Sequence, residues 1–183
     1  MSKKAIIVVD IQNDYFPAGK FPLKDVEQAA DNAARVIAHA RKQGDLVVHI
    51  RHDSLEPDAA FFVKDTHGVQ IHDKVANLPD ETLIIKHFMN PYRETGLKSF
   101  LDKNGVTDVV VVGNMSHMCI DAVTRASDDF GFVTTVVHDA CATRDLSFEG
   151  VDVPAKMVHA AFMAALQFGY ANVVTTDAYL IAA

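Results

Sequence analysis

The chain has 183 residues and a mass of 20.0 kDa, which predicts one domain with a single large core and argues against a two-domain cofactor enzyme. Apolar residues make up 49% and charged residues 22%, and the formal net charge of −7 gives no indication of nucleic-acid binding. No apolar run reaches the roughly 18 residues that cross a bilayer, and Asp10 ends the first apolar run too early for a signal peptide, so we expect a cytoplasmic protein.

Six short apolar segments rich in β-branched residues are spread along the chain. Their nearly continuous apolar character is typical of strands that are buried on both faces of a parallel sheet. These segments are residues 5–9, 46–50, 82–86, 108–113, 133–137 and 171–176.

The stretches between these segments have helical spacing of apolar residues at 26–44, 94–105, 118–131 and 154–169. Three of them end in the helix-terminating glycines Gly44, Gly105 and Gly131, and Gly169 has the same place before the last predicted strand. The alternation predicts an α/β fold: one domain over residues 1–183, with a doubly wound, six-stranded, mainly parallel sheet and helices on both faces, as in Rossmann-like proteins.

One long connection, roughly residues 52–80, is too long for an idle loop inside a compact domain. Phe61 and Phe62 make it less polar than a solvated insertion, which is the alternative interpretation. We therefore expect this segment to line or cover a site.

Three chemically useful side chains follow predicted strands. Asp10 ends the first strand, Lys86 ends the third, and Cys119 follows the fourth at the start of a helix. Ligands of open α/β sheets bind beyond the carboxyl ends of the strands, where the strand order reverses. Taken singly, the three residues could be a turn cap, a solvated lysine and a small buried hydrophobic residue.

Taken together, these three residues predict a cysteine nucleophile. A helix N-terminus and the Lys86 ammonium should favour the thiolate of Cys119, and Asp10 could accept the thiol proton and later deliver it to a leaving amine. Backbone amides in the turn before Cys119 could form an oxyanion hole. Cys141 has no such surroundings, and we interpret it as structural.

Three stretches that contain these residues form a recognisable set: VVDIQNDYF at 8–16, IIKHFMNPYRETGLKSFL at 84–101 and VVGNMSHMCIDAVTRASDDFG at 111–131. With them, nearly the whole chain resembles the isochorismatase-like cysteine hydrolases, which include nicotinamidases and N-carbamoylsarcosine amidohydrolases. The resemblance implies an Asp–Lys–Cys triad at Asp10, Lys86 and Cys119. It also implies a non-proline cis peptide at Asn114–Met115 and an oxyanion hole formed by the amides of Met115 and Cys119.

The departures from this family concern its metal and its chemistry. Nicotinamidases carry an Asp-x-His metal motif after the second strand, where this chain has Arg51 and His52. His67, His72 and His87 lack a recognisable ligand spacing, so we expect no metal. Isochorismatases that cleave a vinyl ether lack the nucleophilic cysteine, so Cys119 argues against that activity.

Several side chains near the predicted strand ends could bind substrate. The candidates are Phe16, Phe61, Phe88, Tyr92 and His117, with core packing or a backbone hydrogen bond as the alternative. We expect Asn13 and Asp14 to fix the turn after the first strand through side-chain hydrogen bonds to the backbone.

The resulting prediction is a cysteine-dependent hydrolase of a small amide or carbamoyl-type C–N bond. No G-x-G-x-x-G fingerprint follows a predicted strand, and we expect no cofactor. The alternatives are a thiol-based redox or ligand-sensing protein, and a protein of the same fold whose pocket only binds a small acid or serves assembly. The expected partner is a small-molecule substrate, with neither nucleic acid nor membrane, and family members are commonly homo-oligomers.

Overall fold

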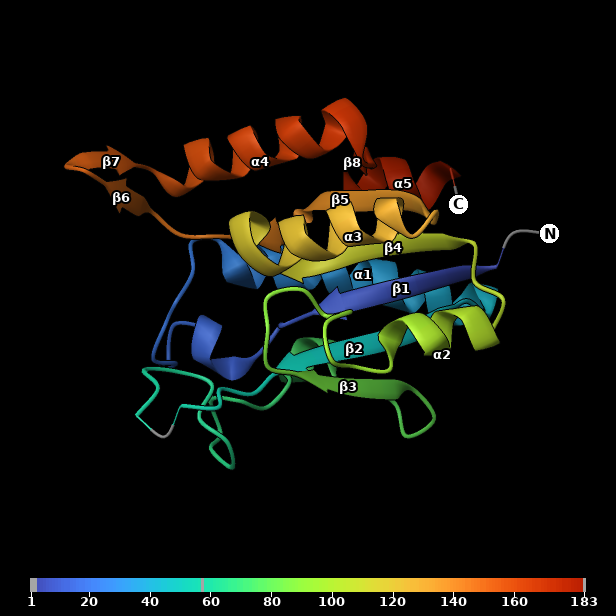
Figure 1. Ribbon diagram of the computed structural model, residues 1–183, viewed down its shortest axis with the longest axis horizontal. Helices are drawn as coiled ribbons and strands as arrows, with labels where there is room; N and C mark the ends of the chain where they lie inside the picture. The colour runs from blue at the N-terminus through green and yellow to red at the C-terminus, as the bar shows by residue number, and fades with distance from the viewer. Residues whose placement is uncertain (1–2, 57, 183) are drawn as a thin grey trace.

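The computed structural model describes residues 3–56 and 58–182 and is built around one six-stranded sheet (Figure 1). The strand order is β3-β2-β1-β4-β5-β8, and every neighbouring pair is parallel. The six predicted strands and the fold class are therefore confirmed. The strands are β1 (Lys4–Val9), β2 (Leu46–His52), β3 (Thr82–Lys86), β4 (Asp108–Asn114), β5 (Val133–Ala142) and β8 (Asn172–Val174).

Helices cover both faces of the sheet and divide the core into two clusters. One cluster joins the sheet to α1 (Val26–Gln43) and α5 (Thr176–Ala182). The other joins it to α2 (Leu97–Lys103), α3 (Asp121–Asp129) and α4 (Ala155–Gly169). In Figure 1, α1 lies behind the strands and α2 and α3 lie in front of them.

The structure adds features that the apolar pattern did not indicate. An antiparallel hairpin, β6 (Leu146–Phe148) and β7 (Val151–Val153), projects from the body beside the start of α4 (Figure 1). The last strand is shorter than predicted because α5 already begins at Thr176. Gly169 is the last residue of α4 and does not follow it, unlike Gly44, which ends α1 with a φ of 76°.

The edge strand β3 also departs from the prediction of strands buried on both faces. Leu83 and Ile85 are exposed, while Lys86 at its carboxyl end is fully buried. The elements packed on the sheet therefore cover only one face of this strand, and its last residue, Lys86, is buried in the protein.

The strand order reverses beside β1. The chain runs from β1 outward through β2 to β3 and then returns to the other side of β1 as β4. At this point Gly113 has a φ of 122°, and a Cβ there would lie 2.0 Å from the carbonyl oxygen of Val9. Only glycine allows β4 to run so close to the end of β1, at the edge of the sheet where ligand binding is predicted.

Candidate active site

Asp10, Lys86 and Cys119 meet at the carboxyl edge of the sheet. The Lys86 Nζ lies 2.8 Å from Asp10 Oδ2 and 3.2 Å from Cys119 Sγ. All three residues are buried, and Cys119 exposes only 2% of its surface. The elements that carry them are far apart in sequence, so the fold brings together the three residues that the sequence singles out.

The backbone of Asp10 is unusual. This residue follows β1 with a φ of 50°, in the left-handed region that non-glycine residues seldom adopt. Its amide donates to the carbonyl of Ile50 at 3.0 Å. Among the described residues, Asp10 Oδ1 has no hydrogen-bond partner. One carboxylate oxygen thus pairs with Lys86 while the other is free to take a proton.

His52 is a fourth member of this group, which the sequence analysis considered only as a metal ligand. Its Nδ1 lies 2.8 Å from Lys86 Nζ, so the ammonium has three neighbours: a carboxylate, an imidazole and a thiol. Burial and the adjacent Lys86 lower the pKa of His52 to about 4, which keeps the ring neutral and able to accept a hydrogen bond. Its place at the end of β2, on the same sheet edge as Lys86, was the signal available in the sequence.

The thiol of Cys119 differs from the expectation of a favoured thiolate. Burial raises its pKa, Asp10 raises it further, and Lys86 only partly opposes both effects. Burial lowers the pKa of Lys86, but Asp10 and Cys119 outweigh this effect and raise it overall. The resting site therefore holds a Lys86 ammonium, 2.8 Å from Asp10 Oδ2, beside a neutral thiol.

Cys119 lies in a π-helical turn, η3 (Ser116–Ile120), that leads into α3. The Asn114–Met115 peptide bond before this turn is cis, at the position that the family resemblance implies. The Met115 carbonyl accepts bonds from the amides of Met118 at 3.0 Å and Ile120 at 3.2 Å. The turn is thus closed on itself around the cysteine.

Buried side chains fix this turn from both sides. The amide of Asn114 donates to the Asp10 carbonyl at 3.3 Å, and its oxygen accepts from the Ala142 amide at 3.3 Å. The Ser116 hydroxyl lies 2.8 Å from Nδ1 of His159 on α4. The ends of β1 and β5 and helix α4 therefore all hold the cysteine turn in place.

His117 contacts a side chain and not the backbone. Its Nδ1 lies 2.6 Å from the Thr143 hydroxyl, and its ring packs edge-on against Phe162. Burial and the nearby Arg144 lower the pKa of His117, so the ring is neutral at physiological pH.

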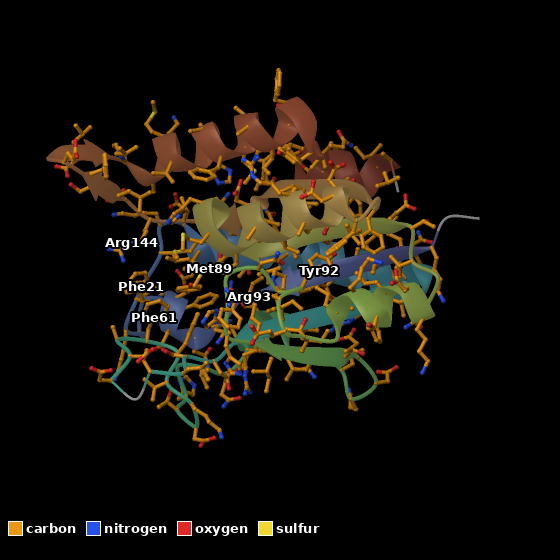
Figure 2. All side chains as sticks on the ribbon, in the orientation of Figure 1. Phe21, Phe61, Met89, Tyr92, Arg93 and Arg144 are labelled. Carbon is orange, nitrogen blue, oxygen red and sulfur yellow. The ribbon has the colours of Figure 1, made fainter. Side chains whose placement is uncertain are left out.

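Several side chains at this edge of the sheet were not singled out in the sequence. Met89, on the loop after β3, places its sulfur 3.7 Å from Cys119 Sγ. Phe21 stacks on Phe61 at 4.2 Å between centroids, and the Arg144 guanidinium lies 4.2 Å from the Phe21 ring. Figure 2 shows these four side chains on the side toward which the strands run. Phe61 was among the predicted pocket residues.

The remaining aromatic candidates have other contacts. Phe16 is buried and stacks on His72 at 3.6 Å, beside a separate hollow of about 340 Å³ that the triad residues do not line. Tyr92 turns away from the mouth, and its hydroxyl lies 2.8 Å from that of Ser127 in the core (Figure 2). The Phe88 ring is covered by the Arg93 guanidinium at 3.6 Å.

The long connection after β2 is fastened to the segment that follows Asp10. Buried Gln12 donates to the carbonyls of His52 at 2.9 Å and Val69 at 2.8 Å and accepts from the His52 amide. Asp14 accepts from the Phe62 amide at 2.7 Å, so it bonds to the backbone as expected, although largely across to the long connection. This connection carries Phe61, which stacks on Phe21.

The side chains around Lys86 include residue types that bind metal ions. Among the described residues, one group of potential ligands lies close enough together: atoms of Asp10, His52 and Cys119 within 4.8 Å of one another. Lys86 Nζ contacts all three residues. Its ammonium group therefore lies where a bound metal ion would have to lie. Arg51 pairs with Asp53 at 2.7 Å, in the region where the family's metal motif was sought.

The other histidines have protein partners. The His67 ring lies 3.3 Å from the Asn13 amide, His72 accepts from the Lys74 amide, and His87 lies 2.7 Å from the Asp53 carbonyl. The second cysteine, Cys141, is buried and donates to the Val137 carbonyl at 3.4 Å. No helix in the described part of the chain is long and apolar enough to span a membrane.

The fold and site together define an α/β protein with a buried cysteine, lysine and aspartate at its topological switch point. The family model of the isochorismatase domain matches residues 4–178, and the chain belongs to this family of hydrolases.

Three relatives illustrate the similarity. The isochorismatase family protein YddQ of Bacillus subtilis is 49% identical over 176 residues, which cover 96% of this chain and 98% of that protein. A crystal structure of an isochorismatase hydrolase from Oleispira antarctica is 46% identical, with a TM-score of 0.95 and coverage of 98% of this chain and 97% of that one. Streptothricin hydrolase of Streptomyces noursei is 33% identical over 143 residues, which cover 78% of this chain and 51% of that protein.

Proposed function

We propose that this protein is a cysteine hydrolase that cleaves the C–N bond of a small carboxamide or carbamoyl-type compound through a thioester on Cys119. The proposal rests on the position of Lys86 Nζ. This atom lies 2.8 Å from Asp10 Oδ2 and 3.2 Å from Cys119 Sγ, and all three residues are buried. This arrangement combines a nucleophile, a base and a fixed cation, which is what covalent acyl transfer requires.

In the first step, the thiol proton of Cys119 moves to Asp10 as the sulfur attacks the substrate carbonyl carbon. Asp10 Oδ1, which has no partner among the described residues, is the acceptor. The ammonium of Lys86 then stabilises the thiolate in place of the carboxylate. The transfer moves a negative charge within the site and adds none, so it does not change the net charge of the buried group.

In the second step, the tetrahedral intermediate collapses and the C–N bond breaks. The amides of Met115 and Cys119 would stabilise the oxyanion, as the family resemblance implies. Asp10 returns its proton to the departing nitrogen, because an amide anion is too poor a leaving group. Ammonia or an amine leaves, and the acyl group remains on sulfur.

In the third step, water hydrolyses the thioester. Asp10 takes a proton from the attacking water, the carboxylic acid departs, and the sulfur recovers its proton. His52 remains neutral throughout and accepts a hydrogen bond from Lys86, which keeps the ammonium directed at the two anionic groups.

The mouth of the site supports a small substrate. Met89 Sδ lies 3.7 Å from the sulfur, and at the same edge of the sheet the rings of Phe21 and Phe61 stack on each other with the Arg144 guanidinium 4.2 Å from Phe21. In this proposal the apolar rings suit a flat or apolar substituent, and the guanidinium suits an anionic one. His117, which faces Thr143, is a candidate substrate contact because it lies two residues before the nucleophile.

The competing redox-sensor function has less support. Redox-sensing cysteines are exposed thiols with a low pKa, often next to a resolving cysteine. Cys119 is buried with a raised pKa, and Cys141 makes its own bond to Val137. A relative named streptothricin hydrolase also favours hydrolysis.

A panel of small primary amides, ureas and carbamoyl compounds, scored by ammonia release, tests the proposal. The panel should include aromatic and carboxylate-bearing members. We expect turnover by the wild type and by Cys141→Ala, and none by Cys119→Ala. A covalent adduct on Cys119, seen as a mass shift after acid quench, would identify the thioester. Ammonia release that persists in Cys119→Ala would refute it.

A further inference from the structure

Met89 is an exposed residue whose sulfur contacts the buried nucleophile. Its Sδ lies 3.7 Å from Cys119 Sγ, where it can accept the hydrogen bond of the thiol. Cys119 exposes 2% of its surface, whereas Met89 exposes 41%. Of these two sulfur-bearing side chains, Met89 is therefore the one that a reagent dissolved in water can reach.

The loop that carries Met89 is held by contacts of its neighbours (Figure 2). The Tyr92 amide donates to Asn90 Oδ1 at 3.0 Å, and the Arg93 amide donates to the Asn90 carbonyl at 3.1 Å. The Arg93 guanidinium also covers the ring of Phe88 at 3.6 Å. These contacts fix the backbone around Met89, so its flexible, unbranched side chain is held beside the nucleophile.

The two sulfur atoms differ in their reactivity toward peroxides. A cysteine is oxidised as its thiolate, and burial raises the pKa of the Cys119 thiol. A thioether has no proton to lose, so its oxidation to the sulfoxide requires only that the sulfur be reached. A peroxide should therefore oxidise Met89 before it oxidises Cys119.

We propose that Met89 is an oxidation site through which hydrogen peroxide reversibly lowers the reactivity of Cys119. An Sδ lone pair attacks one peroxide oxygen, the O–O bond breaks, and the other oxygen leaves with both hydrogen atoms as water. The thioether is thereby oxidised by two electrons to a sulfoxide. A methionine sulfoxide reductase reverses the change, because two of its thiols become a disulfide and the sulfoxide oxygen leaves as water.

Oxidation should strengthen the contact between the two side chains. A thioether sulfur is a weak hydrogen-bond acceptor, whereas a sulfoxide is polar and its oxygen accepts well. The Cys119 thiol is the nearby donor, since the Lys86 ammonium already faces Asp10, His52 and the sulfur. The oxidised side chain would hold the thiol proton and stay against the sulfur, where a substrate carbonyl carbon has to arrive.

This form of control differs from a cysteine redox sensor. It needs neither a sulfenic acid on Cys119 nor a resolving cysteine, and Cys141 keeps its bond to the Val137 carbonyl. It rests on the proposed function only for the reaction that it controls, because the reactivity of the thiol can be measured without a substrate.

Peptide mapping after a limited dose of hydrogen peroxide tests the site of oxidation. Trypsin cuts after Lys86 and Arg93, so Met89 and Cys119 lie in different peptides. We expect Met89 to gain one oxygen atom while Cys119 stays reduced. Among the methionines that the structure describes, Met157 is also exposed, at 60%, and serves as the reference. Oxidation of Cys119 before Met89 would overturn the proposal.

The rate of Cys119 alkylation by iodoacetamide tests the consequence. A hydrogen bond of ordinary strength changes an equilibrium about fivefold, so the peroxide-treated wild type should be alkylated about fivefold more slowly. Methionine sulfoxide reductases that act on the two epimers should restore the rate, whereas dithiothreitol alone should not. This measurement holds even if the panel of amides gives no turnover, so failure of the proposed function and failure of this proposal are distinguishable.

Two matched variants assign the effect to Met89, each compared with its own untreated sample. Met89→Leu cannot form a sulfoxide at this position, so peroxide should leave its rate of Cys119 alkylation unchanged. Met157→Leu removes the other exposed methionine and should respond to peroxide as the wild type does. An unchanged or faster rate in the oxidised wild type, or equal slowing in Met89→Leu, would overturn the proposal.

Discussion

Replacing Asp10 by asparagine should make Cys119 more reactive toward alkylating agents while abolishing amide turnover. In the wild type, Asp10 is the counterion of Lys86 and raises the pKa of the thiol. Without the carboxylate, the Cys119 thiolate becomes the natural counterion of the buried ammonium. The same change removes the group that delivers a proton to the leaving nitrogen, so the two activities should separate.

The size of the effect follows from the geometry. Atoms of Asp10 and Cys119 lie within 4.8 Å, where two negative charges repel by about 3.5 kcal/mol at an effective dielectric constant of about 20. Relief of that repulsion increases thiolate formation by roughly 300-fold. Because nucleophilicity falls as the thiol becomes more acidic, about half of the gain on a logarithmic scale is lost. We therefore expect alkylation to be about twentyfold faster.

The assay is the rate of iodoacetamide modification of Cys119 at pH 7, followed by mass spectrometry, with Cys141 as the internal reference. The double variant Asp10→Asn/Lys86→Met is the control, because loss of the ammonium should remove the gain. If Asp10→Asn is alkylated no faster than the wild type, Lys86 does not stabilise the thiolate. If Asp10→Asn keeps near wild-type amide turnover, another residue transfers the proton, and His117 is the first candidate.

Three further predictions concern the same site. In the wild type, limited alkylation should modify Cys119 before Cys141, because only Cys119 has a base and a cation beside it; faster modification of Cys141 would contradict this assignment. Activity should survive exhaustive chelation, since Lys86 contacts every member of the Asp10, His52 and Cys119 group; activity that is lost and then restored by zinc or manganese would show a functional metal. His52→Leu should lower kcat at least tenfold with little change in KM, and His52→Asn, which keeps an acceptor, should recover part of the loss; equal effects of the two variants would indicate a purely structural role.

Local pattern was sufficient to predict the sheet and the three central residues. A buried parallel strand appears in the sequence as a continuous run of apolar residues. The carboxyl ends of parallel strands lie at the same edge of the sheet, regardless of the conformation of the connecting loops. Asp10 and Lys86 directly follow or end such runs. The β6–β7 hairpin was missed because its strands are three residues long and mostly exposed, so they carry no apolar run.

The lining of the site was harder to predict because it depends on how irregular segments pack. Phe16 follows the Asp10 strand but stacks on His72, and Tyr92 follows Lys86 but bonds to Ser127. Met89, three residues after Lys86, is the side chain that reaches the sulfur. Sequence distance from a catalytic strand end says little about direction in a loop, where side chains have no fixed periodicity.

The pKa of the thiol was mispredicted because sequence shows which charges are near a group but not how deeply it is buried. In a buried site, forming a thiolate beside an ionised Asp10 adds a net charge and is costly. Moving the proton from Cys119 to Asp10 leaves the net charge of the Asp10, Lys86 and Cys119 group unchanged. The neutral His52, which accepts from the same ammonium, also adds no charge in either state. Burial therefore disfavours a free thiolate at rest, and in the proposed mechanism the thiolate forms by a proton transfer that keeps the net charge of the buried group constant.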